Sequence, residues 1–164
     1  MRKPICSLQK AHTGKKALKI DFSSFPGKLL EEKERGSISW TQTASKDILE
    51  NLKGKKIRFS AWLYYENISS IRNSGPSFVV RSWKGKDLIS KDPSVQLSLQ
   101  GLTEQGYASI EGFRDKWIKV EAEGIIPPET ERMDFHCSIS KKNYLGESND
   151  SSVYVDDINA ALVP

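Results

Sequence analysis

The sequence is poor in cysteine and has no long apolar run. Two of its 164 residues are cysteine, which is too few for a disulfide framework, and the spacing of Cys6 and Cys137 is not that of metal ligands. No stretch approaches the roughly eighteen consecutive apolar residues of a membrane span, and the N-terminus lacks the apolar core of a signal peptide. These absences predict a soluble chain that is either intracellular or a module of a larger secreted protein.

Catalytic motifs are also missing. The sequence has no G-x-S-x-G elbow, no His-Glu zinc-binding helix and no glycine-rich phosphate loop. A glycosidase needs two carboxylates that flank the scissile bond, and nothing in the pattern of Glu111, Glu121 and Glu123 singles them out for that work. We therefore predict that the protein is not an enzyme.

Strong charge of one sign is missing as well. The chain has 25 Lys and Arg against 21 Asp and Glu, a net charge of +4, and its basic residues are dispersed among turn sequences. A nucleic-acid-binding surface is normally more basic and more clustered. We expect no nucleic-acid partner.

What the sequence does have is alternation of apolar and polar residues. Its length favours one globular domain with a core. The apolar residues from Ile57 to Leu63 fall on one face of a strand, and Arg58, Ser60 and Trp62 fall on the other. Eight such segments are predicted as strands: 17–22, 37–43, 57–65, 77–83, 94–100, 116–124, 132–140 and 152–158.

Turn sequences rich in glycine and proline separate these strands. One short helix is predicted over 45–52, with Ser45 as its N-cap and Gly54 after its end. Because helices and strands do not alternate along the chain, we predict an all-β fold, an antiparallel β-sandwich or jelly roll. The polar residues 66–76 are predicted to form a loop that borders a binding site.

The two cysteines leave two alternatives open. Cys137 lies in an alternating apolar run, which favours a small core residue. A Cys6–Cys137 bridge is the other alternative.

Four motifs then occur in a fixed order: 11-AHTGKKALKI-20, 52-LKGKKIRFSAWL-63, 115-DKWIKV-120 and 153-VYVDDI-158. Together they resemble carbohydrate-binding modules of families 4, 9, 16 and 22, which have a galactose-binding-domain-like jelly roll. The resemblance implies a non-catalytic glycan-binding module of a larger extracellular, polysaccharide-active or cell-surface protein, with an attached catalytic domain. It implies a single domain over 11–164. Residues 1–10 are then an extension or a divergent first strand, because the N-x-x-F-E-like segment of these modules is missing.

The resemblance also implies a structural Ca²⁺. Its ligands would be Asp156 or Asp157 together with backbone carbonyls near Gly14 and Lys15, and such hard oxygen ligands suit Ca²⁺. The acidic residue that the modules supply from their first strand is missing here, so we expect a weakened site. In the alternative interpretation the two aspartates make local hydrogen bonds at a turn and a sheet end.

A glycan groove needs aromatic rings for the C–H faces of the sugars and polar side chains for their hydroxyls. Outward-facing residues of the predicted strands supply both kinds. The predicted stacking residues are Trp62, Tyr64, Trp83 and Tyr107, and the predicted hydroxyl contacts are Arg58, Arg81, Gln96 and His136.

Structural roles compete with these assignments. Trp62 could pack under a loop as a scaffold residue, and His136 could make only a structural hydrogen bond. Trp40 and Trp117 are predicted to be structural. At the level of function, the main alternative is a protein-interaction or structural β-sandwich without a glycan site. A third reading, suggested by the positive net charge, is a domain that binds an anionic glycan.

Overall fold

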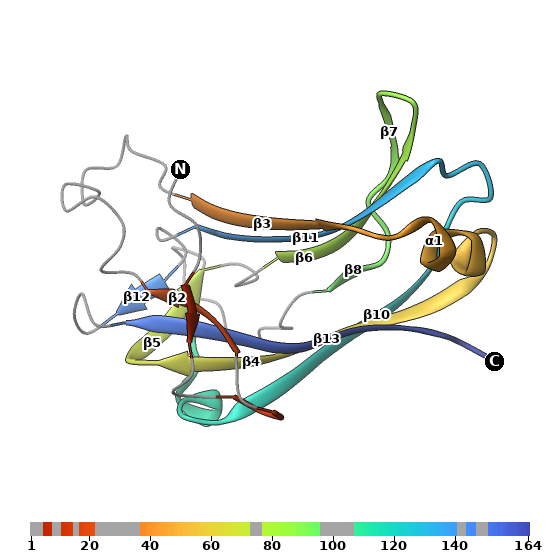
Figure 1. The fold of residues 1–164 in the computed structure, drawn as a ribbon. Coiled ribbons are helices and arrows are strands. Elements are labelled where there is room, and N and C mark those ends of the chain that lie inside the picture. Colours follow the sequence, from red (N-terminus) through yellow and green to blue (C-terminus); the bar gives the residue numbers. More distant parts are fainter. Residues whose placement is uncertain are drawn as a thin grey trace.

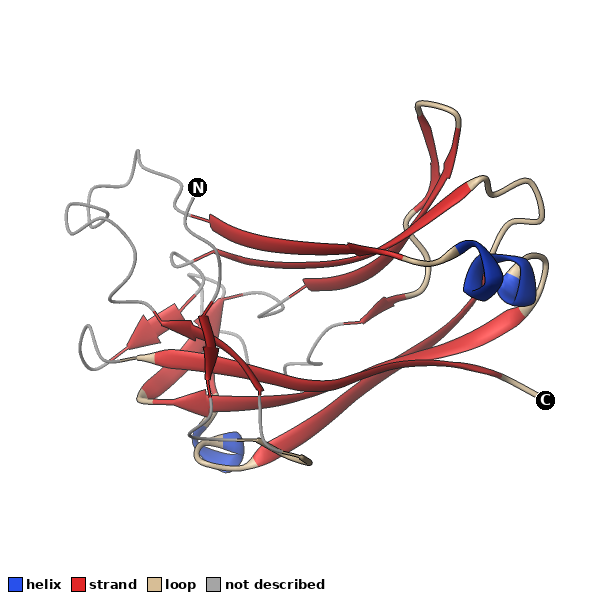
Figure 2. Cartoon of the chain, viewed as in Figure 1, coloured by secondary structure: helices blue, strands red, loops and turns tan. Residues whose placement is uncertain are grey.

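The computed structural model describes residues 5–7, 11–14, 17–21, 37–72, 77–95, 107–140, 144–146 and 151–164. Strands dominate this part of the chain (Figure 2), and two antiparallel sheets are stacked face to face (Figure 1). The antiparallel β-sandwich predicted from the sequence is confirmed. No helix in the described ranges is long and apolar enough to cross a membrane.

Sheet A has five strands, in the order β1-β2-β13-β4-β10. Their bounds are Ile5–Ser7 (β1), Ala17–Asp21 (β2), Ser152–Leu162 (β13), Lys56–Glu66 (β4) and Trp117–Ile125 (β10). The C-terminal strand β13 lies between β2 and β4, so both ends of the chain contribute to one sheet. The segment 1–10 thus contributes a short strand that pairs with β2.

Sheet B has the order β3-β11-β6-β7, with β8 also paired to β6. Its strands are Ser37–Thr43 (β3), Arg132–Ser140 (β11), Ser77–Lys84 (β6), Asp87–Ser90 (β7) and Ser94–Val95 (β8). A small third sheet, sheet C, joins Tyr144–Gly146 (β12), Ile68–Arg72 (β5) and Tyr107–Ser109 (β9). A short 3₁₀ helix, η2, covers Glu111–Phe113.

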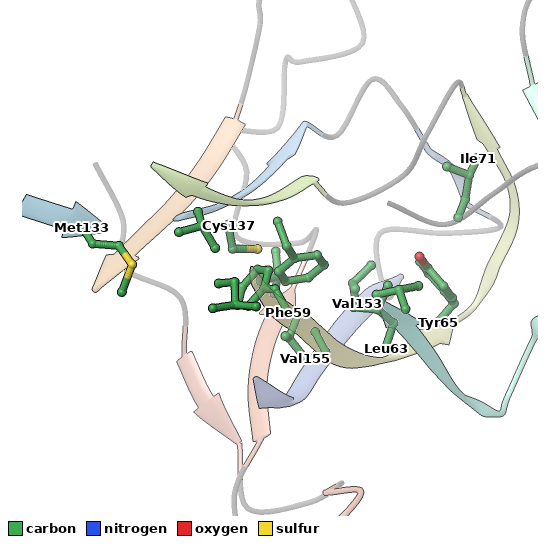
Figure 3. Close-up of a cluster of buried hydrophobic side chains, with 14 of the residues drawn as sticks. Phe59, Leu63, Tyr65, Ile71, Met133, Cys137, Val153 and Val155 are labelled. Carbon is green, nitrogen blue, oxygen red and sulfur yellow. The ribbon is translucent and has the colours of Figure 1, made fainter. Parts of the chain in front are cut away.

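The core lies between sheets A and B (Figure 3). The inward face of β4 is closed to solvent, with Ile57, Ala61 and Leu63 all 0% exposed. Sheet B covers it with its own inward residues, among them Met133 and Cys137. The alternation in the sequence therefore identified the core face of β4 correctly.

The predicted helix is present as α1, Lys46–Leu52. The Ser45 side chain accepts a hydrogen bond from the Ile48 N–H at 3.4 Å, as an N-cap does. Leu49 and Leu52 are buried against the core, while Ile48 stays 47% exposed. Gly54 follows the helix with φ of +68°, a backbone conformation that favours glycine.

The prediction of a polar loop over 66–76 is wrong for its first part. Strand β5 begins at Ile68, directly after Asn67, whose φ is +55°. Ile68 and Ile71 are both 0% exposed, although a spacing of three is not the period of a regular strand. The pairing of β5 with β12 shifts register between its partners Leu145 and Gly146, and such a bulge turns both isoleucines to the same side.

Cys137 is a free thiol, 2% exposed, so the bridge to Cys6 is not formed. Burial raises the pKa of the Cys137 thiol to about 12. The core interpretation of this cysteine is the correct one.

Candidate functional site

The residues predicted to bind a ligand do not form one surface. Arg58, Trp62 and Tyr64 alternate with the core residues of β4 and lie on the outer face of sheet A. Arg81, Trp83 and His136 lie on the outer face of sheet B. Since the two sheets pack through their inner faces, these two sets lie on opposite sides of the sandwich.

The other two predicted residues cannot be placed on either face. Gln96 lies outside the described residues. Tyr107 begins β9, where its backbone pairs with Arg72 in sheet C, and its side chain lies outside the described part of the chain.

Aromatic side chains on the outer face of sheet A pack against one another. The His12 ring is stacked on Trp62, with 3.7 Å between centroids and 16° between planes. The Trp117 ring meets Tyr64 at 5.5 Å, and Tyr64 meets Tyr154 edge-on at 5.9 Å. One face of Trp62 is therefore occupied by the N-terminal turn, which is the arrangement that the scaffold interpretation of Trp62 describes.

Arg58 on the same face is held by an ion pair. Its Nη2 lies 2.6 Å from Oε1 of Glu123 on β10, and Lys56 binds the other oxygen of Glu123. These cations hold the pKa of the Glu123 carboxyl below its ordinary value. Both partners are well exposed to solvent, so the pair adds little to stability.

Asp156 and Asp157 bind the turn that contains His12 and Thr13. Asp156 Oδ2 accepts hydrogen bonds from the backbone N–H groups of His12 at 2.8 Å and Thr13 at 3.3 Å. Asp157 Oδ1 accepts from the Thr13 hydroxyl at 2.5 Å, and its Oδ2 lies 2.8 Å from His12 Nδ1. We call these four residues the terminal clamp, because they tie the start of the chain to its last strand.

The terminal clamp also bears on the calcium prediction. The Thr13 hydroxyl and then the His12 ring hold the pKa of the Asp157 carboxyl below its ordinary value. The remaining oxygen, Asp156 Oδ1, accepts a hydrogen bond from the Asp157 N–H at 2.9 Å. All four carboxylate oxygens of the two aspartates therefore have donors within the protein. No group of three acidic, histidine or cysteine residues suited to a metal occurs among the described residues, and Lys15 lies outside them. Calcium binding stays a prediction.

The outer face of sheet B carries a cavity of about 340 Å³. Strands β6, β7, β8 and β11 and the loop after β7 contribute its lining, which consists of Ser77, Val79, Arg81, Leu88, Lys91, Ser94, His136 and Ser138. Two of the predicted residues, Arg81 and His136, are thus brought together. We call this cavity the sheet B groove.

Asp134 organises the polar residues beside the groove. Its side chain is almost fully buried, and it accepts hydrogen bonds from the Thr43 hydroxyl at 2.9 Å and Trp83 Nε1 at 2.8 Å. Arg81 Nη2 and Arg132 Nε each lie 3.6 Å from its oxygens. A buried carboxylate needs such partners, and in return it fixes the orientation of Arg81.

His136 lies in the middle of this face, between β3 and β6. Its Nδ1 is 2.9 Å from the Thr41 hydroxyl, and Arg81 Nη2 donates to the same hydroxyl at 3.3 Å. Burial, and then the positive charge of Arg81, lower the pKa of His136 below its ordinary value. The ring is therefore both hydrogen-bonded and open to the groove.

The sequence did not point to Thr41 or to several residues of the groove. Thr41, which contacts His136 and Arg81, lies on a predicted strand next to Trp40, so alternation places it on the opposite face from Trp40. Lys91 lies in the loop after β7, where no period marks which way a side chain points. Ser94 and Leu88 carry no chemical signal that distinguishes them from other surface residues.

The chain matches no protein-family model and no curated protein sequence. Its fold is similar to solved carbohydrate-binding modules. A family 16 module is 10% identical, with a TM-score of 0.53 over 95% of this chain and 83% of that one. A family 22 xylan-binding domain of Xyn10C from Paenibacillus barcinonensis is 13% identical, with a TM-score of 0.52 over 98% and 87%. Another family 22 xylan-binding domain is 12% identical, with a TM-score of 0.53 over 97% and 81%.

At such low identity these similarities show the fold. The chain has the jelly-roll β-sandwich of these modules, and the resemblance seen in its four sequence motifs extends to the whole architecture.

Proposed function

We propose that the protein binds a polysaccharide without cleaving it, through the sheet B groove. The observation that carries the proposal is a polar cavity of about 340 Å³ on the outer face of one sheet, in a fold shared with carbohydrate-binding modules. The cavity has the size of a ligand pocket. Its serine hydroxyls, guanidinium and imidazole are groups that hydrogen-bond sugar hydroxyls.

The lining of the groove supports a glycan over a protein partner. The large exposed apolar residues of the described chain are Ile48, Leu88, Phe113, Ile125 and Leu162, and of these only Leu88 lines the groove. A protein-binding surface normally gathers such residues into one patch.

In this proposal the chain is one module of a larger extracellular, polysaccharide-active or cell-surface protein. Its role would be to hold an attached catalytic domain on the polysaccharide. Modest affinity is enough for that purpose, because attachment turns binding into a high local concentration of substrate.

Affinity electrophoresis tests the proposal. The purified chain is run through gels that contain a panel of soluble neutral or acidic polysaccharides. We expect at least one of them to retard it, and we expect His136→Ala to weaken that binding about tenfold, because a hydrogen-bonding group is lost from the groove.

The matched control is Arg58→Ala, on the outer face of sheet A. It should leave retardation unchanged. If Arg58→Ala abolishes binding and His136→Ala does not, the ligand binds the opposite face of the sandwich. If a folded chain is retarded by no polysaccharide, the proposed function is wrong and a protein partner becomes the better hypothesis.

A further inference from the structure

The sheet B groove is lined by cationic groups and contains no Trp, Tyr or Phe ring among its described lining residues. Its charged lining residues are Arg81 and Lys91, with His136 beside them. A neutral sugar chain is held largely by stacking on aromatic rings. This lining lacks that contact and instead offers the groups that bind a carboxylate or a sulfate.

Trp83, on the outer face of sheet B, is engaged within the protein. Its Nε1 donates to Asp134, and the guanidinium of Arg132 lies 4.5 Å from the centre of its ring. Arg81 lies 5.7 Å from the same centre. The indole therefore supports two cations at the edge of the groove.

Asp134 offsets only part of this positive charge. It lies 3.6 Å from both Arg81 Nη2 and Arg132 Nε, so one carboxylate faces two guanidinium groups, and Lys91 adds a further cation at the groove. The Arg81 side chain is 21% exposed and lines the cavity, so part of it is open to the groove. Lys91 is exposed at the groove.

We propose that the sheet B groove binds an anionic glycan, whose carboxylate or sulfate ester lies between Arg81, Lys91 and His136. The inference rests on the proposed function and names the class of polysaccharide. Ser77, Ser94 and Ser138, which line the same cavity, supply hydroxyls for the uncharged part of the sugar.

His136 makes this binding sensitive to pH. Burial and the charges of Arg81 and Lys91 lower its pKa, Asp134 opposes them, and Thr41 contacts Nδ1. In the free protein the ring is therefore neutral at pH 7. A bound anion favours the imidazolium and raises that pKa, so affinity for the anion increases as the pH falls from about 7 toward the lowered pKa of His136.

Affinity electrophoresis with matched polymers tests the inference. The gels contain polygalacturonate, its fully methyl-esterified form, dextran sulfate or dextran. We expect retardation by a charged polymer, loss of retardation with its neutral counterpart, and weakening as NaCl rises from about 0.05 to about 0.5 M. Retardation by polygalacturonate identifies a uronate as the anion, and retardation by dextran sulfate alone identifies a sulfate ester.

Two lysine variants test the site itself. Lys91→Glu should weaken binding about tenfold, because it places a carboxylate beside the bound anion. Lys86→Glu, in the exposed turn between β6 and β7, changes the net charge equally and should have little effect. Equal losses in both variants would show a general charge effect and overturn the assignment to the groove.

Different outcomes of these experiments would contradict the anionic class of ligand and the proposed function itself. If neutral polymers such as dextran or the methyl-esterified form retard the chain as strongly as the charged ones, the anionic class is wrong while glycan binding stands. If none of the four polymers and none of the wider panel retards the folded chain, both are wrong.

Discussion

Two buried tyrosines differ in what their hydroxyl groups contact. Tyr65 is 0% exposed, and its hydroxyl has no hydrogen-bond partner in the described part of the chain. Tyr154 is 2% exposed, and its hydroxyl donates to Glu66 Oε2 at 2.9 Å. A buried hydroxyl without a partner costs free energy, and burial also raises the pKa of Tyr65.

We therefore expect Tyr65→Phe to raise the free energy of unfolding by about 1 kcal/mol, because it removes an unsatisfied polar group from the core. Tyr154→Phe should lower it by about 1 kcal/mol, because it removes a satisfied hydrogen bond from a residue of the same type. Urea unfolding monitored by fluorescence measures both. Equal destabilisation by the two changes would contradict the structure, since the Tyr65 hydroxyl would then need a partner.

At the scale of single residues, alternation in the sequence predicts which side chains point outward. It placed Arg81, Trp83 and His136 on the outer face of a strand correctly. It could not predict that Asp134, another outward residue, would be buried. That burial comes from Trp83 and Arg81 on the neighbouring strand, and the register between two strands is not visible in either one alone.

Strand β10 and the loop before β8 approach each other at a glycine. A Cβ atom on Gly124 would lie 2.8 Å from Cγ of Asp92 and 2.9 Å from the backbone nitrogen of Pro93. Both distances are far below van der Waals contact, so the two elements pack closely only because residue 124 has no side chain.

We expect Gly124→Ala to lower the free energy of unfolding by about 2 kcal/mol, as overpacking of a closed contact does. Gly112→Ala is the control, because a Cβ there meets nothing within 4 Å. Thermal unfolding followed by circular dichroism compares the two variants. If Gly124→Ala is as stable as the control, β10 and the β8 loop are further apart than the structure shows.

At the scale of elements, regular strands could be predicted and irregular ones could not. The ranges predicted for β3 and β11 agree with the structure, because their alternation is unbroken. Strand β5 was missed, because its bulge gives Ile68 and Ile71 a spacing that no regular strand has. Strand β10 ends at Ile125, one residue past its predicted end at Gly124. This glycine allows the close contact with Asp92 and Pro93 and does not mark a turn.

At the scale of the whole molecule, the sequence did not reveal which outward faces belong to the same sheet. Trp62 and Trp83 both lie on outer faces, but β4 belongs to sheet A and β6 to sheet B. Strand order depends on long-range pairing, and the alternation within a strand carries no information about it. The predicted set of ligand-binding residues therefore mixed two surfaces on opposite sides of the sandwich.

The terminal clamp joins residues that are more than 140 positions apart in the sequence, from His12 and Thr13 to Asp156 and Asp157. The Asp156 carboxylate accepts two backbone N–H groups of the N-terminal turn, and such charge-assisted bonds are stronger than neutral ones. Asp156→Asn keeps the shape and removes the charge. We expect it to lower the melting temperature by about 3 °C in the presence of a chelator.

Asp87→Asn, on the exposed strand β7, is the matched control for the loss of one negative charge and should leave the melting temperature unchanged. Repeating the melts with calcium separates the two interpretations of the aspartate pair. If hydrogen bonds alone hold the clamp, the unaltered chain has the same melting temperature with calcium as with the chelator. If calcium raises that temperature and Asp156→Asn abolishes the rise, the cation competes successfully with the N–H and O–H donors, because binding to the folded state alone stabilises it.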